Sequence, residues 1–175
     1  MDDSIKRLQI PDELVHPFFF SENEIAVKKP PVPFTLEVNF ICELFYYNGI
    51  ETFKPWVSYE EVIPTLLDKW QTEKDHLKLL HRERDQKNIL QSMKKGIGLF
   101  IQLLFWSNGE PVQLNESFSI LELAYKPVNV QERLRFIISR PNLFHSYIQL
   151  SELMLEQEKQ YEKKNIMKKA FRPKV

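Results

Sequence analysis

The sequence predicts an all-α protein: a single compact bundle of about five to seven helices, with an irregular N-terminal arm and a protruding C-terminal helix. Three observations favour this fold class. Glycine is scarce (4 residues) and proline is common (11), and the prolines separate helical patterns. Long runs of alternating apolar and polar residues, which are typical of strands, are absent. Both Asn-Gly pairs follow helical patterns, so they predict helix ends and not hairpin turns.

Residues 1–34 are expected to form the irregular arm. Pro11, Pro17 and the stretch KKPPVPF at 28–34 interrupt regular structure and leave room only for a short turn at 11–15. The apolar HPFFF at 16–20 predicts that the arm packs on the core.

Helical patterns follow from residue 35 onward. Ser58-x-x-Glu61 and Asn129-x-x-Glu132 have the spacing of helix N-termini. Pro64 falls inside the helix that Ser58 opens, so this helix either tolerates the proline early or restarts there. The expected helical stretches are approximately 35–47, 58–84, 86–107, 117–125, 129–140 and 142–169.

The stretch 86–107 is expected at the centre of the bundle, because its second half is apolar nearly all round. Gly96 and Gly98 within it then predict points of close packing. The last helix carries a broad apolar stripe over 143–155 that fades after about Gln157. We therefore expect one helical domain over 35–157 and a basic helical extension over 158–175 that leaves the body.

Two decapeptides, FICELFYYNG at 40–49 and FIQLLFWSNG at 100–109, share six residues in the same order. The shared apolar residues are spaced to occupy one buried helix side, and the shared Asn-Gly supplies the left-handed conformation that ends a helix. The match therefore predicts two central helices with the same kind of end, and not a functional repeat. The residues at those ends form a candidate surface for a protein partner: Tyr46, Tyr47, Trp106 and Asn108.

Charge and cysteine content exclude some broad classes. Lysine plus arginine number 24 and aspartate plus glutamate 24, so the whole chain has no electrostatic footprint for nucleic acid or an anionic membrane. The single cysteine, Cys42, excludes an internal disulfide, suits a reducing compartment and sits among apolar residues as inert packing. No signal peptide is expected, because the N-terminal MDDSIKRLQIPDEL is acidic and polar. No membrane span is expected, because the most apolar run covers only 97–106. We expect a soluble, cytoplasmic protein.

No catalytic motif is recognisable, so we expect no enzyme activity and no cofactor. Ferritin-like metal sites need two Glu-x-x-His pairs on long helices. The chain has Glu73-x-x-His76 in a predicted helix and Glu13-x-x-His16 in the irregular arm, where helical geometry fails. Solvated polar residues explain these pairs more simply, so no metal is expected. A helical-bundle metal protein or enzyme remains a third hypothesis.

The C-terminal tail is the candidate nucleic-acid contact. A cationic helix end of this kind could hold phosphates, and Lys164 and Lys168 share one face. A simpler explanation is that basic residues complement the helix dipole or are solvated. The candidate contacts are Lys163, Lys164, Lys168, Lys169, Arg172 and Lys174.

Five segments, taken in order, resemble a known family: IPDELVHPFFF, LFYYNG…PW, LFWSNGEPVQL, KPVNVQERLRFI and LFHSYIQLSEL. Together they resemble the YpoC-like family of Bacillus and related low-GC bacteria. The resemblance implies a small cytoplasmic protein and a gene neighbourhood of DNA replication, DNA repair and cell-wall synthesis. It implies no catalytic or binding residue.

The sequence therefore predicts a non-enzymatic intracellular interaction or accessory protein with an unknown protein partner. The alternative is a nucleic-acid-associated factor that acts through the basic C-terminal helix. A homo-oligomer is also open, because the last helix could pair with a copy of itself.

Overall fold

The computed structural model describes residues 5–28, 36–115 and 120–171. Within these ranges the chain forms five α-helices, two 3₁₀ turns and one two-stranded sheet, which confirms the all-α class. In chain order the elements are β1 (Lys6–Gln9), a 3₁₀ turn (Asp12–Leu14), β2 (Glu24–Val27), α1 (Ile41–Tyr47), α2 (Tyr59–Glu83), α3 (Gln86–Trp106), a 3₁₀ turn (Ile120–Glu122), α4 (Val130–Ser139) and α5 (Phe144–Ala170).

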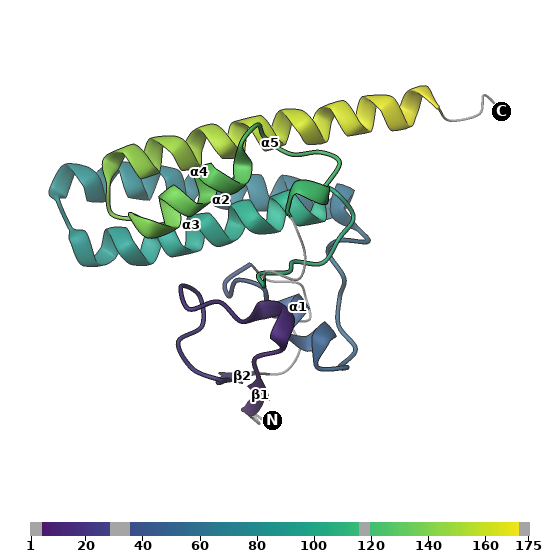
Figure 1. Ribbon diagram of the computed structural model, residues 1–175, viewed down its shortest axis with the longest axis horizontal. Helices are drawn as coiled ribbons and strands as arrows, with labels where there is room; N and C mark the ends of the chain where they lie inside the picture. The colour runs from purple at the N-terminus through teal and green to yellow at the C-terminus, as the bar shows by residue number, and fades with distance from the viewer. Residues whose placement is uncertain (1–4, 29–35, 116–119, 172–175) are drawn as a thin grey trace.

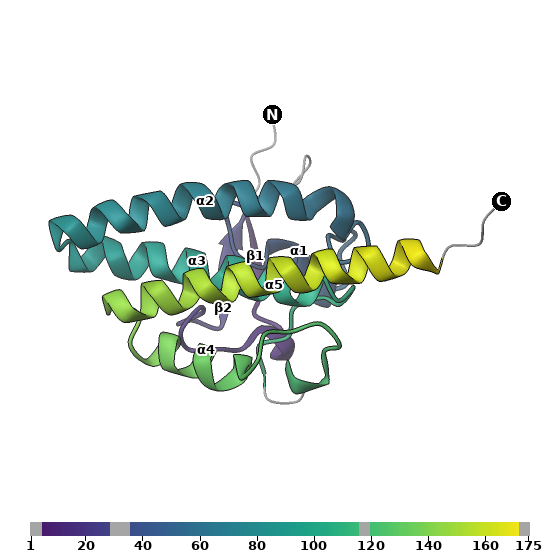
Figure 2. The same ribbon diagram turned by 90° about the horizontal axis from the view of Figure 1, so that it is seen from above.

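The three long helices α2, α3 and α5 run side by side, and α4 lies along α5 on the side away from α2 (Figures 1 and 2). The arm and α1 lie on the opposite side of α3 from α5 (Figure 1). Every residue of α3 from Gly96 to Trp106 is buried, as its all-round apolar character predicts. A Cβ atom at Gly96 would lie 2.9 Å from the Trp70 ring and 3.1 Å from Leu150, so glycine permits the close approach of α2 and α5 to α3.

The ends of α1 and α3 are built alike, as the matched decapeptides predict. Gly49 and Gly109 have φ of 72° and 75°, the left-handed conformation that glycine adopts without strain. In both cases the amide after the glycine donates to the carbonyl of a phenylalanine five residues earlier, Phe45 or Phe105, at 3.0 Å. The preceding asparagine also bonds back to the carbonyl four residues before it.

The starts of α2 and α4 lie where the sequence predicts them, but without the predicted caps. Neither Ser58 nor Asn129 makes a side-chain cap hydrogen bond. Asn129 instead adopts a left-handed conformation with φ of 54°. Pro64 lies inside α2 near its start, so the helix tolerates it without restarting.

The N-terminal arm is more regular than expected. β1 and β2 pair antiparallel, with Lys6 opposite Val27 and Gln9 opposite Glu24. These strands have four residues each, too short for alternation to reveal them, and their pairing depends on a contact across the intervening loop. Leu14 and Phe19, at 0% and 8% exposed, pack the arm on the core.

α5 keeps contact with the body well beyond Gln157, where the fading apolar stripe had predicted that it would leave. Tyr161 is buried, and Lys164 and Lys168 both contact other segments. The contacts after Gln157 are made by one tyrosine and two lysine side chains, which an apolar stripe does not reveal. The C-terminal end of α5 still extends past the other helices (Figure 1).

Candidate protein-binding groove

The candidate partner surface at the ends of α1 and α3 is largely built into the body. Trp106 is 0% exposed, and its Nε1 donates to Glu43 Oε1 at 2.6 Å. It therefore offers no surface to a partner. Every side of α3 is buried at this end, so a tryptophan here is buried whichever way it points.

The other three residues of that predicted surface differ in exposure. The Tyr47 hydroxyl donates to Val112 O at 3.0 Å, and Asn108 Nδ2 donates to Tyr125 O at 2.8 Å. Both side chains are half-buried and join loops to helix ends. Tyr46 is 40% exposed and packs edge-to-face against Trp56. Only Tyr46 presents an exposed aromatic ring.

The Glu43 side chain of α1 joins the end of α3 to the loop that follows it. It is fully buried, and its Oε1 accepts from both Trp106 Nε1 and the Val112 amide, at 2.6 Å and 3.2 Å. Burial raises the pKa of the Glu43 carboxyl to about 7, although these hydrogen bonds oppose the shift. Burial, aided by the adjacent Glu43 carboxylate, raises the pKa of the Cys42 thiol to about 12. The thiol therefore stays protonated at neutral pH, as inert packing requires.

Two lysines of the basic tail are bound to the body. Lys164 Nζ donates to Ser107 O at 2.7 Å and lies 4.3 Å from the centre of the Tyr59 ring. Lys168 pairs with Glu60 at 3.0 Å. Lys163 and Lys169 are exposed. The remaining two candidate contacts, Arg172 and Lys174, lie outside the described residues.

The Glu-x-x-His pairs do not combine. Glu73 accepts a hydrogen bond from the buried Ser92 hydroxyl and so joins α2 to α3. His16 Nδ1 accepts from the Phe18 amide within the arm. Across the described ranges, no three His, Cys, Asp or Glu side chains are grouped as a metal site.

A cleft of about 630 Å³ lies between the arm and α4 and is lined by His16, Phe105 and Arg135 among others. At this cleft Leu114 N donates to Glu13 O at 2.7 Å, and Asn115 Nδ2 donates to Asp12 O at 3.1 Å. These polar groups fasten the arm to the loop that follows α3.

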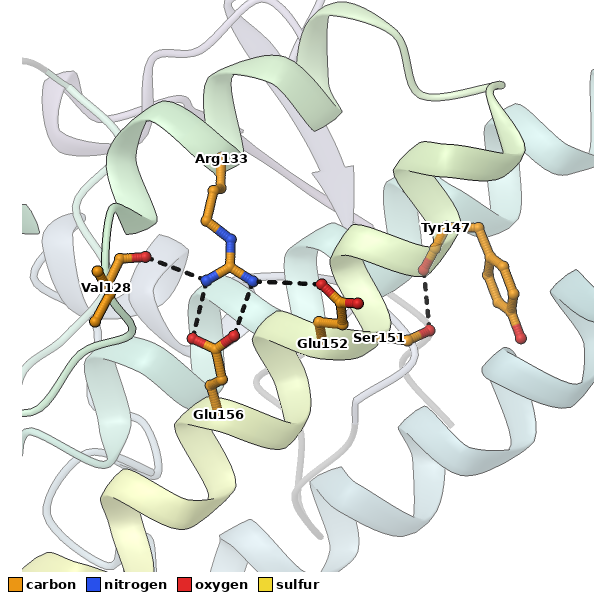
Figure 3. A network of polar contacts seen from close by, with 6 residues as sticks. All are labelled: Val128, Arg133, Tyr147, Ser151, Glu152 and Glu156. Atoms are coloured by element: carbon orange, nitrogen blue, oxygen red, sulfur yellow. Dashed lines mark hydrogen bonds and ion pairs between the residues drawn. The ribbon is translucent and has the colours of Figure 1, made fainter.

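The side of α5 that faces α4 is closed. Arg133 on α4 makes a two-pronged ion pair with Glu156, with both N–O distances at 2.9 Å (Figure 3). It also donates to Val128 O at 3.1 Å and lies 3.9 Å from Glu152. A planar guanidinium held by three partners fixes α4 on α5.

The side of α5 that faces α2 is open. A groove of about 460 Å³ runs between the two helices. Leu67 and Trp70 of α2 and Ile148, Met154 and Leu155 of α5 supply its apolar lining. Leu155 is 53% exposed and Ile148 36% exposed, so apolar surface lies open to solvent here. We call this feature the α2–α5 groove.

The charged side chains that line the α2–α5 groove are mainly acidic. Asp68, Glu152 and Glu158 carry carboxylates, and Lys74 carries the one basic group within the described lining. At one end of the groove the rings of His81, Phe144 and Tyr147 cluster, with centroids 5.4 to 5.6 Å apart. Burial lowers the pKa of His81, so the ring of this residue favours its neutral form.

The helices that form this groove fall in the part of the chain that matches a known family. Residues 60–169 match the model of the family described as YpoC-like protein. The chain belongs to the YpoC-like family. It is 33% identical over 115 residues to the uncharacterized protein YpoC of Bacillus subtilis (strain 168), a match that covers 65% of this chain and 70% of that protein. No solved structure matches the chain significantly.

The resemblance predicted from the sequence is thus confirmed. The YpoC-like region begins one residue after the start of α2 and ends one residue before the end of α5. It includes both helices of the α2–α5 groove, whereas the arm and α1 precede it. Among the described residues, no helix combines the length and apolar character needed to cross a membrane.

Sequence reasoning treated the apolar stripe over 143–155 as core and so missed the exposed part of it. The structure divides that stripe into two faces: Tyr147, Leu150 and Met154 are buried, while Phe144 (56%) and Leu155 (53%) are exposed. The width of the stripe could have indicated this, because a stripe broader than one helix face needs a second surface to cover it.

Proposed function

We propose that this member of the YpoC-like family is a non-enzymatic intracellular interaction protein. Its α2–α5 groove binds an amphipathic helix of another polypeptide chain, with apolar residues on one face and basic residues beside them. The observation that carries the proposal is the exposure of Leu155 and Ile148 in an apolar groove whose charged lining residues are mainly acidic.

The physical basis is the mode in which a helix lies in an apolar groove between two others. α2 and α5 both pack on α3 (Figure 2). Residues of both helices line the groove between them, an arrangement into which another helix can pack. Covering the exposed parts of Leu155 and Ile148 gains about 1 kcal/mol each. The carboxylates of Asp68, Glu152 and Glu158 select basic partners and speed their approach.

The alternative, nucleic-acid binding through the C-terminal tail, has less support. Lys164 and Lys168 are held by Ser107 O, Tyr59 and Glu60, so binding phosphate there would break contacts that fix α5. Lys163 and Lys169 remain available as exposed side chains. An acidic groove and a basic tail also favour different partners.

Two designed helical peptides of about 18 residues test the proposal. Both carry leucine on one face, and the rest of the surface is lysine in one peptide and glutamate in the other. By fluorescence anisotropy, we expect the lysine peptide to bind with micromolar affinity and the glutamate peptide to bind at least about tenfold more weakly. Leu155→Lys should abolish binding of the lysine peptide.

Val15→Lys is the matched control, because Val15 is 55% exposed and lies in the arm, outside the groove. This variant should bind the lysine peptide as the unmodified protein does. Equal binding of both peptides, or unchanged binding to the Leu155→Lys variant, would exclude the groove as the binding site.

A further inference from the structure

α5 carries its charges asymmetrically along its length. Residues 144–158 contain three glutamates and no lysine or arginine, whereas residues 159–170 contain five lysines and one glutamate. When two such helices pair antiparallel, the acidic half of each helix lies beside the basic half of the other. A parallel pair would place like charges together.

Four exposed apolar side chains of α5 also point in nearly the same direction. Successive residues of a helix turn by about 100°, so Phe144, Ile148, Leu155 and Ile166 lie within about 40° of one direction. All four are exposed, Ile166 to 69%. On the opposite side of the helix, Leu150 and Gln157 are buried against the body. α5 therefore combines exposed apolar side chains in one direction with a basic end, the two features that we propose for a helix bound in the groove.

We infer that the α2–α5 groove receives α5 of a second copy of this chain, in an antiparallel pairing about a two-fold axis near Leu155. The inference rests on the proposed function and names the partner of the same site. A two-fold contact is self-complementary, so each α5 lies against the groove of the other copy. A separate partner helix and the second copy then exclude each other from the groove.

The pairing fixes which residues meet. With Leu155 against Leu155 of the second copy, Phe144 lies opposite Ile166 of the second copy. Glu152 lies one residue away from the position opposite Lys159 of the second copy, and both side chains are exposed. Each contact occurs twice because of the two-fold axis. The two Glu152–Lys159 contacts therefore stabilise the antiparallel pairing over the parallel one.

The contact is of modest size. From Phe144 to Ile166 the paired helices extend about 33 Å, at about 1.5 Å per residue. An interface of one helix pair and a groove edge belongs to the small, reversible class. We therefore expect a dimer that dissociates in the micromolar range.

Sedimentation velocity of the full chain over a range of concentrations tests the inference. The unmodified protein should shift from monomer to dimer, and Leu155→Lys should weaken the dimer at least about tenfold. Val15 is 55% exposed, close to the 53% of Leu155, and lies outside the groove, so Val15→Lys should dimerise normally. Circular dichroism checks that all variants retain their helices.

Charge exchange tests the direction of the pairing. Lys159→Glu should weaken the dimer several-fold because it sets two carboxylates beside each other, and adding Glu152→Lys in the same chain should restore it. Glu152 lies 3.9 Å from Arg133, which keeps its two-pronged ion pair with Glu156 in this variant. A single Leu155→Cys substitution should form a disulfide-linked dimer under mild oxidation, because the two-fold axis brings the two sulfurs together. Cys42 is buried and does not compete, and Val15→Cys is the control.

The outcomes separate the inference from the proposed function. A dimer that the Leu155→Lys change weakens, that the charge exchange restores and that the lysine peptide dissociates supports both. A chain that stays monomeric yet binds the peptide through Leu155 overturns the inference alone. A dimer insensitive to Leu155→Lys also overturns it. A monomer that binds neither peptide overturns both.

Discussion

The C-terminal end of α3 and the α2–α5 groove distribute polar and apolar groups in opposite ways. At the end of α3, polar side chains are buried and bonded: Glu43 to Trp106, and Gln157 to Ser107 Oγ at 2.8 Å. In the groove, Leu155 and Ile148 are exposed beside carboxylates in solvent. α5 takes part in both regions: Gln157 bonds at the end of α3, and Leu155 lines the groove.

The difference shows which region holds the fold and which can accept a partner. Buried polar groups need fixed partners, and their loss leaves unsatisfied charge or hydrogen-bond donors. Exposed apolar side chains contribute little to the isolated fold, and their burial becomes favourable only with a second surface. Substitutions at the end of α3 should therefore change stability, and substitutions in the groove should change binding.

Trp106→Ala should have the largest effect on stability. It removes a side chain that is 0% exposed and takes a donor from the buried Glu43 carboxyl. We expect the free energy of unfolding to fall by about 3–5 kcal/mol, measured by urea denaturation. A loss below about 1 kcal/mol would show that the end of α3 is not a rigid buried junction.

Glu43→Gln should change how stability depends on pH. The folded pKa of Glu43, about 7, lies above its ordinary value of 4.5, so the folded state favours the protonated carboxyl. Its contribution is complete below pH 4.5 and is lost as the pH rises through 7. Between pH 5 and pH 8 the unmodified protein should lose about 2–3 kcal/mol relative to the Glu43→Gln variant.

Urea denaturation of both proteins at several pH values measures this difference, and comparing the two cancels the titration of the other groups. Glutamine keeps an oxygen that can accept from Trp106 and the Val112 amide, so the variant should fold. A stability difference that stays constant from pH 5 to pH 8 would contradict a carboxyl that titrates near neutrality.

Lys164→Met should have a smaller effect at the same junction. The change removes the hydrogen bond to Ser107 O and the cation over the Tyr59 ring, while it keeps the apolar stem. We expect a loss of about 1 kcal/mol in the free energy of unfolding. Lys163→Met, at the exposed neighbouring position, should leave stability unchanged. Equal effects would show that Lys164 is merely solvated.

The sequence predicts the elements that depend on local patterns. The Asn-Gly pairs locate the ends of α1 and α3, the all-round apolar character of 97–106 predicts the central helix, and Gly96 marks the close contact with Trp70. Each of these features is decided within one helix turn or by one helix face.

The sequence does not predict features that depend on distant partners. Trp106 meets Glu43, 63 positions earlier, and Lys164 meets Ser107, 57 positions earlier. Periodicity shows which face of a helix is buried but not what covers it. For the same reason, periodicity alone does not separate the exposed half of the 143–155 stripe from the buried half.

Leu155→Ser should have the smallest effect on stability and a large effect on binding. Leu155 is 53% exposed, so at a concentration where the chain is monomeric the free energy of unfolding should change by no more than about 0.5 kcal/mol. Binding of the lysine peptide should nevertheless weaken at least about tenfold, because serine removes the most exposed apolar side chain of the groove. Denaturation and anisotropy on the same preparation measure both quantities. If the variant loses several kcal/mol of stability, Leu155 belongs to the core and the contrast between the two regions is wrong. If the variant keeps both its stability and its peptide binding, the binding surface does not include this face of α5.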